Sequence, residues 1–188
     1  KRIFISKGEI HQGVISEIIL PPIQNEDSFF NSIAAFDQKP MILMLDSIQD
    51  PRNLGACLRS ANAAGVTHVV VNKDGSAPIN SLVHRTSAGA LNSLQIFHVT
   101  NLSRTIKQIK KRDIWVVGLD GSTQSPLYDV NLTGSIAIVV GSEGKGIRSL
   151  IKKTCDQVVS IPMSGNIESL NVSVATAITL FEIKRQRE

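Results

Sequence analysis

Apolar residues form short runs from Met41 to the end of the chain, and segments of helical periodicity separate these runs. The runs, rich in valine, isoleucine and leucine, cover 41–45, 67–71, a weaker stretch at 94–99, 114–119, 136–140 and 157–161. The helical segments cover 53–64, 80–90, 101–111, 147–154 and 170–187. Apolar strands that alternate with helices are typical of a mostly parallel sheet with helices on both faces, so the sequence predicts an α/β fold.

Residues 1 to about 40 do not follow this alternation. Gly8, Gly13, the Pro21-Pro22 pair and a polar run at 24–27 interrupt any period, and the pattern allows at most a short helix near 28–36. We interpret residues 1–40 as a linker and residues 41–188 as one main domain.

The last helical segment has an apolar stripe and a polar start. Ser169 stands where a helix N-cap belongs, and Asn171 lies in the first turn. Ser169 either only caps the helix or, with Asn171, faces a ligand beyond the strand ends, and spacing leaves both interpretations open. We expect the stripe to face the core; it consists of Leu170, Val174, Ala177, Ile178 and Phe181.

The helical segment that follows the first strand has a polar and an apolar side. Arg52 and Arg59 lie roughly opposite the apolar stripe, so periodicity favours two solvated arginines. Cys57 belongs to the stripe, which favours a core residue over a nucleophile. The stripe comprises Leu54, Cys57, Leu58 and Ala61.

A glycine-rich loop, Gly141 to Gly146, follows the fifth run. It matches neither the P-loop nor the G-x-G-x-x-G fingerprint, so it assigns neither ATP nor NAD. Its glycines still allow a close approach of the backbone to a ligand, and Glu143 is either a turn residue or an anchor for polar neighbours. Two strand ends that open onto small and polar residues predict a ligand crevice at this edge of the sheet.

The charge and the composition of the chain limit the classes of partner that we expect it to bind. The net charge of +4 and pI of about 9.2 favour a polyanionic partner, and basic clusters at 110–112, 152–153 and 184–187 are either solvated faces or phosphate contacts. The aromatic share of 4% favours phosphate contacts over base stacking.

Metal-ligand spacing is lacking at His68, His84 and His98 and at the two cysteines, so we expect no metal. No apolar run approaches about 18 residues, so we expect no membrane span. The two cysteines do not make a disulfide scaffold, which favours a reducing, cytoplasmic location.

Three segments closely resemble the motifs of the SpoU (TrmH-like) family of RNA ribose methyltransferases, in the SPOUT superfamily. Residues 50–59 (DPRNLGACLR) resemble the first motif, 138–146 (IVVGSEGKG) the second, and 161–175 (IPMSGNIESLNVSVA) the third. Residues 8–14 (GEIHQGV) resemble the segment that precedes the catalytic domain in bacterial members that methylate a guanosine 2′-oxygen in 23S rRNA.

This resemblance implies a domain organisation. Residues 1–40 would be a linker and the remnant of an N-terminal RNA-binding domain, and residues 41–188 would be the catalytic domain. The fold would be the family's parallel α/β sheet with a C-terminal trefoil knot, and the protein a homodimer with knot regions packed together and the active site near the interface.

The resemblance also implies the site residues. S-adenosylmethionine would bind in the knot, at Gly141, Ile161 and Leu170 and at the backbone from Leu119 to Gly121. The catalytic residues would be Asn53, Arg59, Glu143, Ser169 and Asn171. For Arg59 this overrides the solvated interpretation; because a guanidinium has a pKa above about 12, we expect it to stabilise developing alkoxide and hold a phosphate instead of acting as the base.

Three alternatives stay open at this point. The same motifs occur in tRNA ribose methyltransferases, and a non-catalytic RNA-binding member could retain the fold. A nucleotide-dependent enzyme of Rossmann type is disfavoured by both failed fingerprints.

Overall fold

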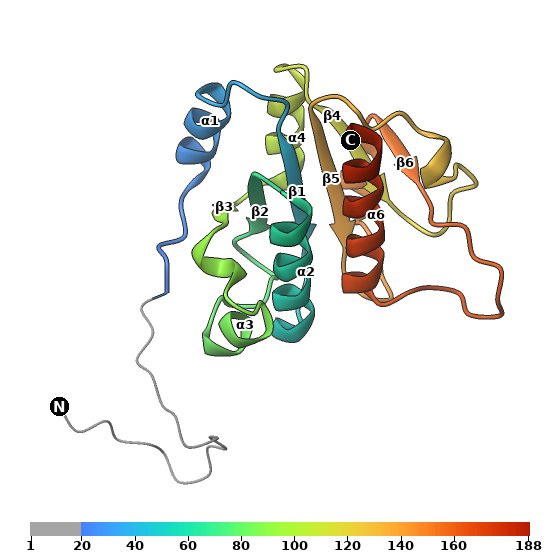
Figure 1. Ribbon diagram of the computed structural model, residues 1–188, viewed down its shortest axis with the longest axis horizontal. Helices are drawn as coiled ribbons and strands as arrows, with labels where there is room; N and C mark the ends of the chain where they lie inside the picture. The colour runs from blue at the N-terminus through green and yellow to red at the C-terminus, as the bar shows by residue number, and fades with distance from the viewer. Residues whose placement is uncertain (1–19) are drawn as a thin grey trace, which may run out of the picture.

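Six strands form one parallel sheet in the order β3-β2-β1-β5-β4-β6 in the computed structural model, which describes residues 20–188 (Figure 1). The strands are β1 (Met41–Asp46), β2 (His68–Asn72), β3 (Gln95–Val99), β4 (Trp115–Leu119), β5 (Ile136–Gly141) and β6 (Gln157–Val159). Each of the six apolar runs therefore overlaps a strand, and the predicted parallel sheet is confirmed. The trefoil knot stays a prediction from the family resemblance.

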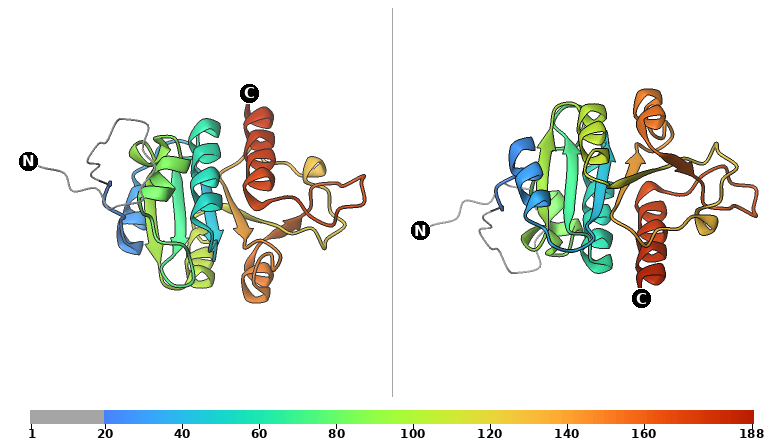
Figure 2. Two further views of the ribbon diagram at one scale, coloured as in Figure 1. Left: turned by 90° about the horizontal axis from the view of Figure 1, so that it is seen from below. Right: turned by 90° about the horizontal axis from the view of Figure 1, so that it is seen from above.

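Helices cover both faces of this sheet, as the sequence predicts. Figure 2 shows α2 and α6 on one face and α4 and α5 on the other. The helices are α1 (Glu26–Ala34), α2 (Pro51–Ala64), α3 (Ser81–Thr86), α4 (Leu102–Lys110), α5 (Ser149–Thr154) and α6 (Val172–Arg187), with 3₁₀ turns η1 (Ala90–Asn92) and η2 (Leu127–Asp129). The segment predicted as one helix over 80–90 ends at Thr86, and the helical path is left at Ala88 and Gly89, which adopt positive φ values of 50° and 86°.

The strands are continuous apolar runs because helices bury both of their sides. In β1, Met41, Leu43 and Leu45 pack with α2 and α6, while Ile42 and Met44 pack with α1, α4 and α5. Successive side chains of a strand point to opposite faces, so a sheet covered on both faces needs apolar residues at every position.

The segment before β1 joins the folded domain. Gln24 pairs with Phe97 at the edge of β3, and α1 buries Phe29 completely and Ile33 almost completely against the sheet. Residues 24–34 are therefore packed structure and not a linker. The segment 8–14 lies outside the described residues.

The start of the last helix differs from the prediction. Helix α6 begins at Val172, and its N-cap is Asn171, whose Oδ1 accepts a hydrogen bond from the backbone N–H of Ser173 at 2.9 Å. Ser169 is exposed and lies two residues before the cap. Of the two interpretations left open for Ser169, the capping one is therefore wrong, because the chain enters the helix about half a turn later than the apolar spacing suggested.

The buried face of α6 also differs from the predicted stripe. Val174 and Phe181 are each 46% exposed, whereas Thr176 and Thr179 are completely buried. The two threonines tolerate burial because each hydroxyl donates to a backbone carbonyl four residues earlier, of Val172 and Ala175. The buried residues of α6 are Val172, Thr176, Thr179, Leu180, Glu182 and Ile183. Part of the apolar stripe is thus left on the surface.

Candidate active site

Four adjacent strands end at one edge of the sheet and bring the three motifs together. Leu119 at the end of β4 is in register with Val140 of β5 and Val159 of β6, and Gly141 is in register with Asp46 of β1. Because parallel strands share a carboxyl edge, the loops that follow β1, β5 and β6 meet there. The crevice edge predicted from the strand ends is therefore the place where the polar residues gather.

Asn53, Glu143 and Asn171 form one hydrogen-bonded cluster at this edge. Asn53 Nδ2 donates to Glu143 Oε2 at 3.0 Å. Asn171 Nδ2 donates to Glu143 Oε1 at 3.1 Å and to Asn53 Oδ1 at 3.1 Å. One residue from each motif contributes, over sequence separations of 28 to 118 residues. Both carboxylate oxygens of Glu143 accept a bond, so the cluster has a defined orientation.

Helix ends hold two members of this cluster in place. Asn53 lies in the first turn of α2, which Asp50 caps by accepting from the N–H of Arg52 at 2.8 Å. Asn171 caps α6, and its Oδ1 also accepts from the Ser173 hydroxyl at 2.6 Å. The side-chain oxygen of Asn171 is thereby occupied, and its amide group is directed to the other two residues.

Arg59 stands apart from the cluster. It follows Asn53 by six residues on α2, which places it about 9 Å further along the axis and about 120° around the helix. Its side chain is exposed, and no hydrogen bond or salt bridge joins it to another described residue. Within one copy, Arg59 therefore does not reach the cluster. Ser169 is also exposed and makes no hydrogen bond in the described part of the chain.

The glycine loop folds tightly on itself. A Cβ on Gly141 would lie 2.0 Å from the backbone carbonyl of Gly146 and 2.2 Å from the Ile147 nitrogen. Gly144 and Gly146 have positive φ values of 77° and 63°. A backbone contact therefore requires glycine at position 141. The turn directs Glu143 towards Asn53 and Asn171.

An ion pair anchors this loop to the end of β1. Arg148 donates through Nε to Asp46 Oδ1 at 2.7 Å, and its backbone N–H donates to Oδ2 at 3.0 Å. The Asp46 side chain is fully buried, while that of Arg148 is 54% exposed. The sequence analysis overlooked this pair, although a carboxylate at the end of the apolar run 41–45 was an available signal.

The predicted cofactor residues line the same edge. Leu119 and Ile161 are partly buried and pack against the core, and Leu170 is half-buried beside the cap of α6. A Cβ at Gly121 would lie 4.0 Å from the carbonyl oxygen of Glu168, so the loops after β4 and β6 approach each other. No hydrogen bond joins residues 161–170 to any other residue that the structure describes. Apolar side chains beside free backbone donors and acceptors fit an adenosine and an amino-acid moiety, as S-adenosylmethionine has.

The structure gives little support for a cysteine nucleophile or a metal site. Cys57 is fully buried, and burial raises the pKa of its thiol to about 11, so it is a core residue and a poor nucleophile. Residues 20–188 contain no group of three or more histidine, cysteine or acidic side chains placed to hold a metal ion. Over the same residues, no helix has the length and apolarity needed to cross a membrane.

Comparison with known proteins identifies one family. The model of the SpoU rRNA Methylase family matches residues 40–181. The 23S rRNA (guanosine-2'-O-)-methyltransferase RlmB of Haemophilus influenzae is 48% identical over 181 residues, 96% of this chain and 73% of that protein. The RlmB protein of Escherichia coli is 47% identical over 97% of this chain and 74% of its own length.

Solved structures agree with this assignment. The A. aeolicus TrmH/SpoU tRNA modifying enzyme superposes with a TM-score of 0.73 and 32% identity over 80% of this chain and 76% of that one. The SpoU methyltransferase AviRb from Streptomyces viridochromogenes, solved with AdoMet, superposes with a TM-score of 0.78 and 27% identity over 88% of this chain and 66% of that one.

Proposed function

The chain belongs to the SpoU rRNA methylase family, and from this premise we propose that it methylates the ribose 2′-hydroxyl of a guanosine in 23S rRNA with S-adenosylmethionine. The observation that carries the proposal is the Asn53–Glu143–Asn171 cluster, in which residues from all three family motifs meet at one sheet edge.

We propose that the cofactor lies in the crevice between the loops after β4, β5 and β6. Leu119, Ile161 and Leu170 would contact the adenine, and the unpaired backbone of residues 161–170 would bind its edge. The tight turn at Gly141 would bring the loop over the ligand. S-adenosylmethionine supplies an electrophilic methyl group on a sulfonium, so the protein's task is alignment of the ribose hydroxyl and management of its proton.

The cluster is suited to this alignment. Glu143 accepts one hydrogen bond from each of the two amides. Asn171 uses both of its amide hydrogens within the cluster, so the second amide hydrogen of Asn53 would orient an incoming ribose oxygen. Ser169, exposed and without a hydrogen bond to any described residue, would contact the sugar. We therefore retain Asn53, Glu143, Ser169 and Asn171 as proposed positioning residues.

Arg59 requires a different placement, and we propose that it serves the reaction centre of a second copy in a homodimer. Arg59 faces solvent on α2 and does not reach its own cluster. The exposed Val174 and Phe181 on the adjacent α6 leave an apolar surface that a second copy would cover. At the partner's site, the guanidinium would stabilise developing alkoxide and hold the target phosphate.

The choice of rRNA over tRNA rests on sequence similarity. The RlmB relatives are up to 48% identical to this chain, whereas the tRNA modifying enzyme of A. aeolicus is 32% identical. We also propose that residues 41–188, together with the packed segment 24–34, form the catalytic domain, that the residues before this segment lead into it from an RNA-binding domain, and that the protein works in the cytoplasm.

The test is incubation of the protein with labelled S-adenosylmethionine and unmodified 23S rRNA or tRNA, followed by mass analysis of nucleosides. We expect labelled 2′-O-methylguanosine from 23S rRNA only. Label in tRNA alone would favour the tRNA enzyme. RNA binding without transfer of label would favour the non-catalytic alternative.

A further inference from the structure

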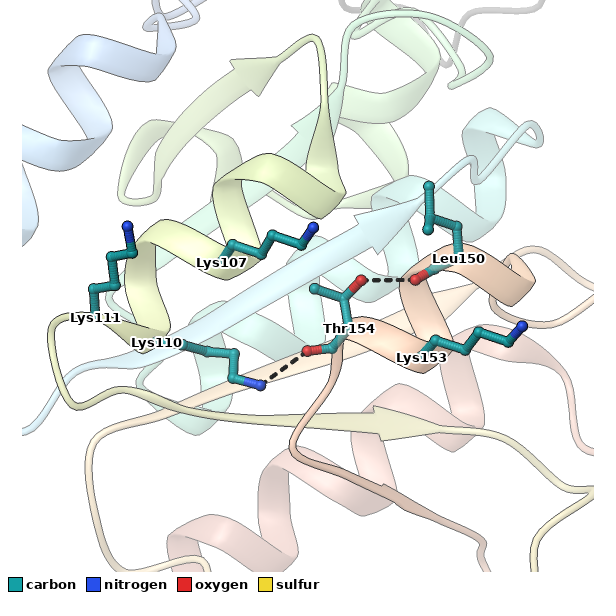
Figure 3. Close-up of a pocket in the computed structure, with 6 residues that line it drawn as sticks. All are labelled: Lys107, Lys110, Lys111, Leu150, Lys153 and Thr154. Carbon is teal, nitrogen blue, oxygen red and sulfur yellow. Dashed lines mark hydrogen bonds between the residues drawn. The ribbon is translucent and has the colours of Figure 1, made fainter.

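A lysine-lined hollow lies between α4 and α5, on the sheet face opposite α2 and α6. Its volume is about 550 Å³, and Figure 3 shows its lining residues, Lys107, Lys110, Lys111, Leu150, Lys153 and Thr154. Lys107 and Lys110 lie on α4, and Lys111 is its C-cap; Lys110 and Lys111 follow Lys107 by three and four residues, so all three share one side of the helix. Lys153 lines the hollow from α5, and none of the lining residues among 20–188 is a carboxylate.

Three of the four lysines are uncompensated in the described part of the chain. Lys110 is different, because its Nζ lies 2.8 Å from Asp156 Oδ1 and donates to the Thr154 carbonyl at 3.1 Å. These contacts tie α4 to the end of α5 and make the wall of the hollow rigid. Lys107, Lys111 and Lys153 are exposed and form no salt bridge with any described residue. The hollow therefore concentrates positive charge on an ordered surface.

A second hollow continues from the first at Leu150 and reaches the carboxyl edge of the sheet. It measures about 250 Å³ and is lined by Thr100, Asn101, Leu102, Ser103, Arg148, Leu150 and Ile151. Asn101 follows the end of β3, and Arg148 binds Asp46 at the end of β1. We name the two hollows together the α4–α5 groove.

The groove has the length of a short stretch of nucleic acid. The nine-residue step from Leu102 to Lys111 spans about 14 Å at roughly 1.5 Å per residue. This matches about four nucleotides of a stacked strand, at roughly 3.4 Å each. One end of the groove lies at the same sheet edge as the Asn53–Glu143–Asn171 cluster.

We propose that the α4–α5 groove binds the phosphate backbone of the substrate RNA, through Lys107, Lys111 and Lys153, while the target nucleotide occupies the site at the sheet edge. This inference rests on the proposed function. RNA is favoured over an anionic membrane because Leu150 is the only large exposed apolar side chain among the described residues that line the groove, and membrane-surface helices need a broad apolar face.

The test compares two double variants that each remove two positive charges. Lys107→Gln/Lys153→Gln alters the groove, and Lys39→Gln/Lys184→Gln alters the opposite, amino-terminal edge, where Arg187 contacts the Lys39 carbonyl. Binding of an unmodified 23S rRNA fragment is measured by filter binding over a salt series, with S-adenosylmethionine affinity measured by calorimetry. We expect the groove variant to bind RNA about tenfold more weakly and to lower the slope of log K against log salt by roughly 1 to 2, because each phosphate contact contributes about 0.7 to 0.9.

The kinetic readout separates this inference from the proposed function. We expect a raised KM for RNA at unchanged kcat in the groove variant, an unchanged S-adenosylmethionine affinity, and wild-type behaviour in the control variant. If the wild-type protein methylates RNA but the two variants bind it equally well, the groove assignment is wrong and the proposed function stands. If the wild-type protein transfers no methyl group, the proposed function fails while the binding comparison still decides the groove. If the groove variant lost the wild-type protein's binding to anionic vesicles but still bound RNA as the wild type does, the inference would be overturned in favour of a membrane surface.

Discussion

The side-chain amide of Asn171 donates a hydrogen bond to Glu143 Oε1 at 3.1 Å, across 28 residues of sequence. The oxygen of the same amide caps α6 by accepting from the Ser173 backbone N–H. Asn171 therefore has a structural atom and a site atom in one side chain. A substitution can change one of these without the other.

Asn171→Asp tests the site atom alone. Aspartate is as good an N-cap as asparagine, so we expect the free energy of unfolding to change by less than about 1 kcal/mol. The substitution removes the Nδ2 donor and places a second carboxylate beside Glu143, so we expect methyl transfer to fall by roughly 100-fold. Single-turnover transfer of labelled methyl groups and thermal unfolding measure the two effects.

The control for this experiment is Ser173→Ala, which removes a hydroxyl that donates to the same Asn171 oxygen at 2.6 Å. It leaves the Nδ2 contacts to Asn53 and Glu143 intact, and we expect activity close to that of the wild type. Equal activities of Asn171→Asp and Ser173→Ala would show that the cluster has no role in transfer.

Gly141→Ala tests the tight turn of the cofactor loop. The added methyl group would lie 2.0 Å from the backbone of Gly146, which cannot move as a flexible side chain can. We expect S-adenosylmethionine affinity to fall at least tenfold in calorimetry, while the circular dichroism of the sheet is retained. Gly134→Ala is the matched control, since a Cβ there meets no atom of residues 20–188 within 4 Å. Unchanged affinity in Gly141→Ala would separate this loop from cofactor binding.

The sheet could be predicted from sequence because its burial is regular. Both sides of β1 are covered, so residues 41–45 are apolar without interruption and signal a strand directly. Helix α6 could be located but not oriented, because Thr176 and Thr179 enter the core through bonds to their own backbone. A polar residue whose hydroxyl donates a hydrogen bond to its own helix can be buried, but a search for apolar positions does not find it.

The candidate site was predicted by residue type and not by geometry. The motifs supplied Asn53, Glu143 and Asn171, but their contact depends on how the loops after three strands close together. The Asp46–Arg148 pair was missed because 102 residues separate its members: Asp46 at the end of β1 shows an acidic residue after an apolar run, but nothing in the sequence pairs it with Arg148.

A mixing experiment tests the proposed role of Arg59. If Arg59 serves the partner's site, Arg59→Ala and Asn171→Asp homodimers are both impaired, but a mixed dimer contains one site with both residues intact. We expect co-purified mixed dimers to regain up to about half of the wild-type activity, and S-adenosylmethionine affinity of Arg59→Ala to stay unchanged. Arg52→Ala, on the same exposed side of α2, is the control. No recovery on mixing would place Arg59 at its own site, and full activity of Arg59→Ala would remove it from the reaction.

Arg148→Gln tests the anchor of the glycine loop. It leaves the buried Asp46 carboxylate with only the backbone N–H of residue 148 as a strong partner, so we expect a loss of about 3 kcal/mol in the free energy of unfolding. Asp46→Asn/Arg148→Gln removes the buried charge as well, and we expect it to recover part of this loss. Urea titrations of both variants make the comparison. A double variant no more stable than Arg148→Gln would contradict a charge-based role.

His68 makes the stability of the fold depend on pH. The ring is fully buried, its nitrogens lie 2.9 Å from the Ser32 hydroxyl and 2.8 Å from the Thr67 hydroxyl, and burial lowers its pKa from 6.5 to about 4. Below pH 6.5 the unfolded chain binds a proton that the folded chain does not accept until about pH 4. The stabilisation is therefore complete above pH 6.5 and is lost as the pH falls towards 4, and at pH 4.5 the loss is roughly 2.5 kcal/mol.

Urea unfolding of the wild type and of His68→Gln at pH 7.5 and 4.5 isolates this contribution, because other titrating groups are common to both proteins. We expect the wild type to lose more stability than the variant by about that amount, and equal losses would show that His68 is not the group responsible.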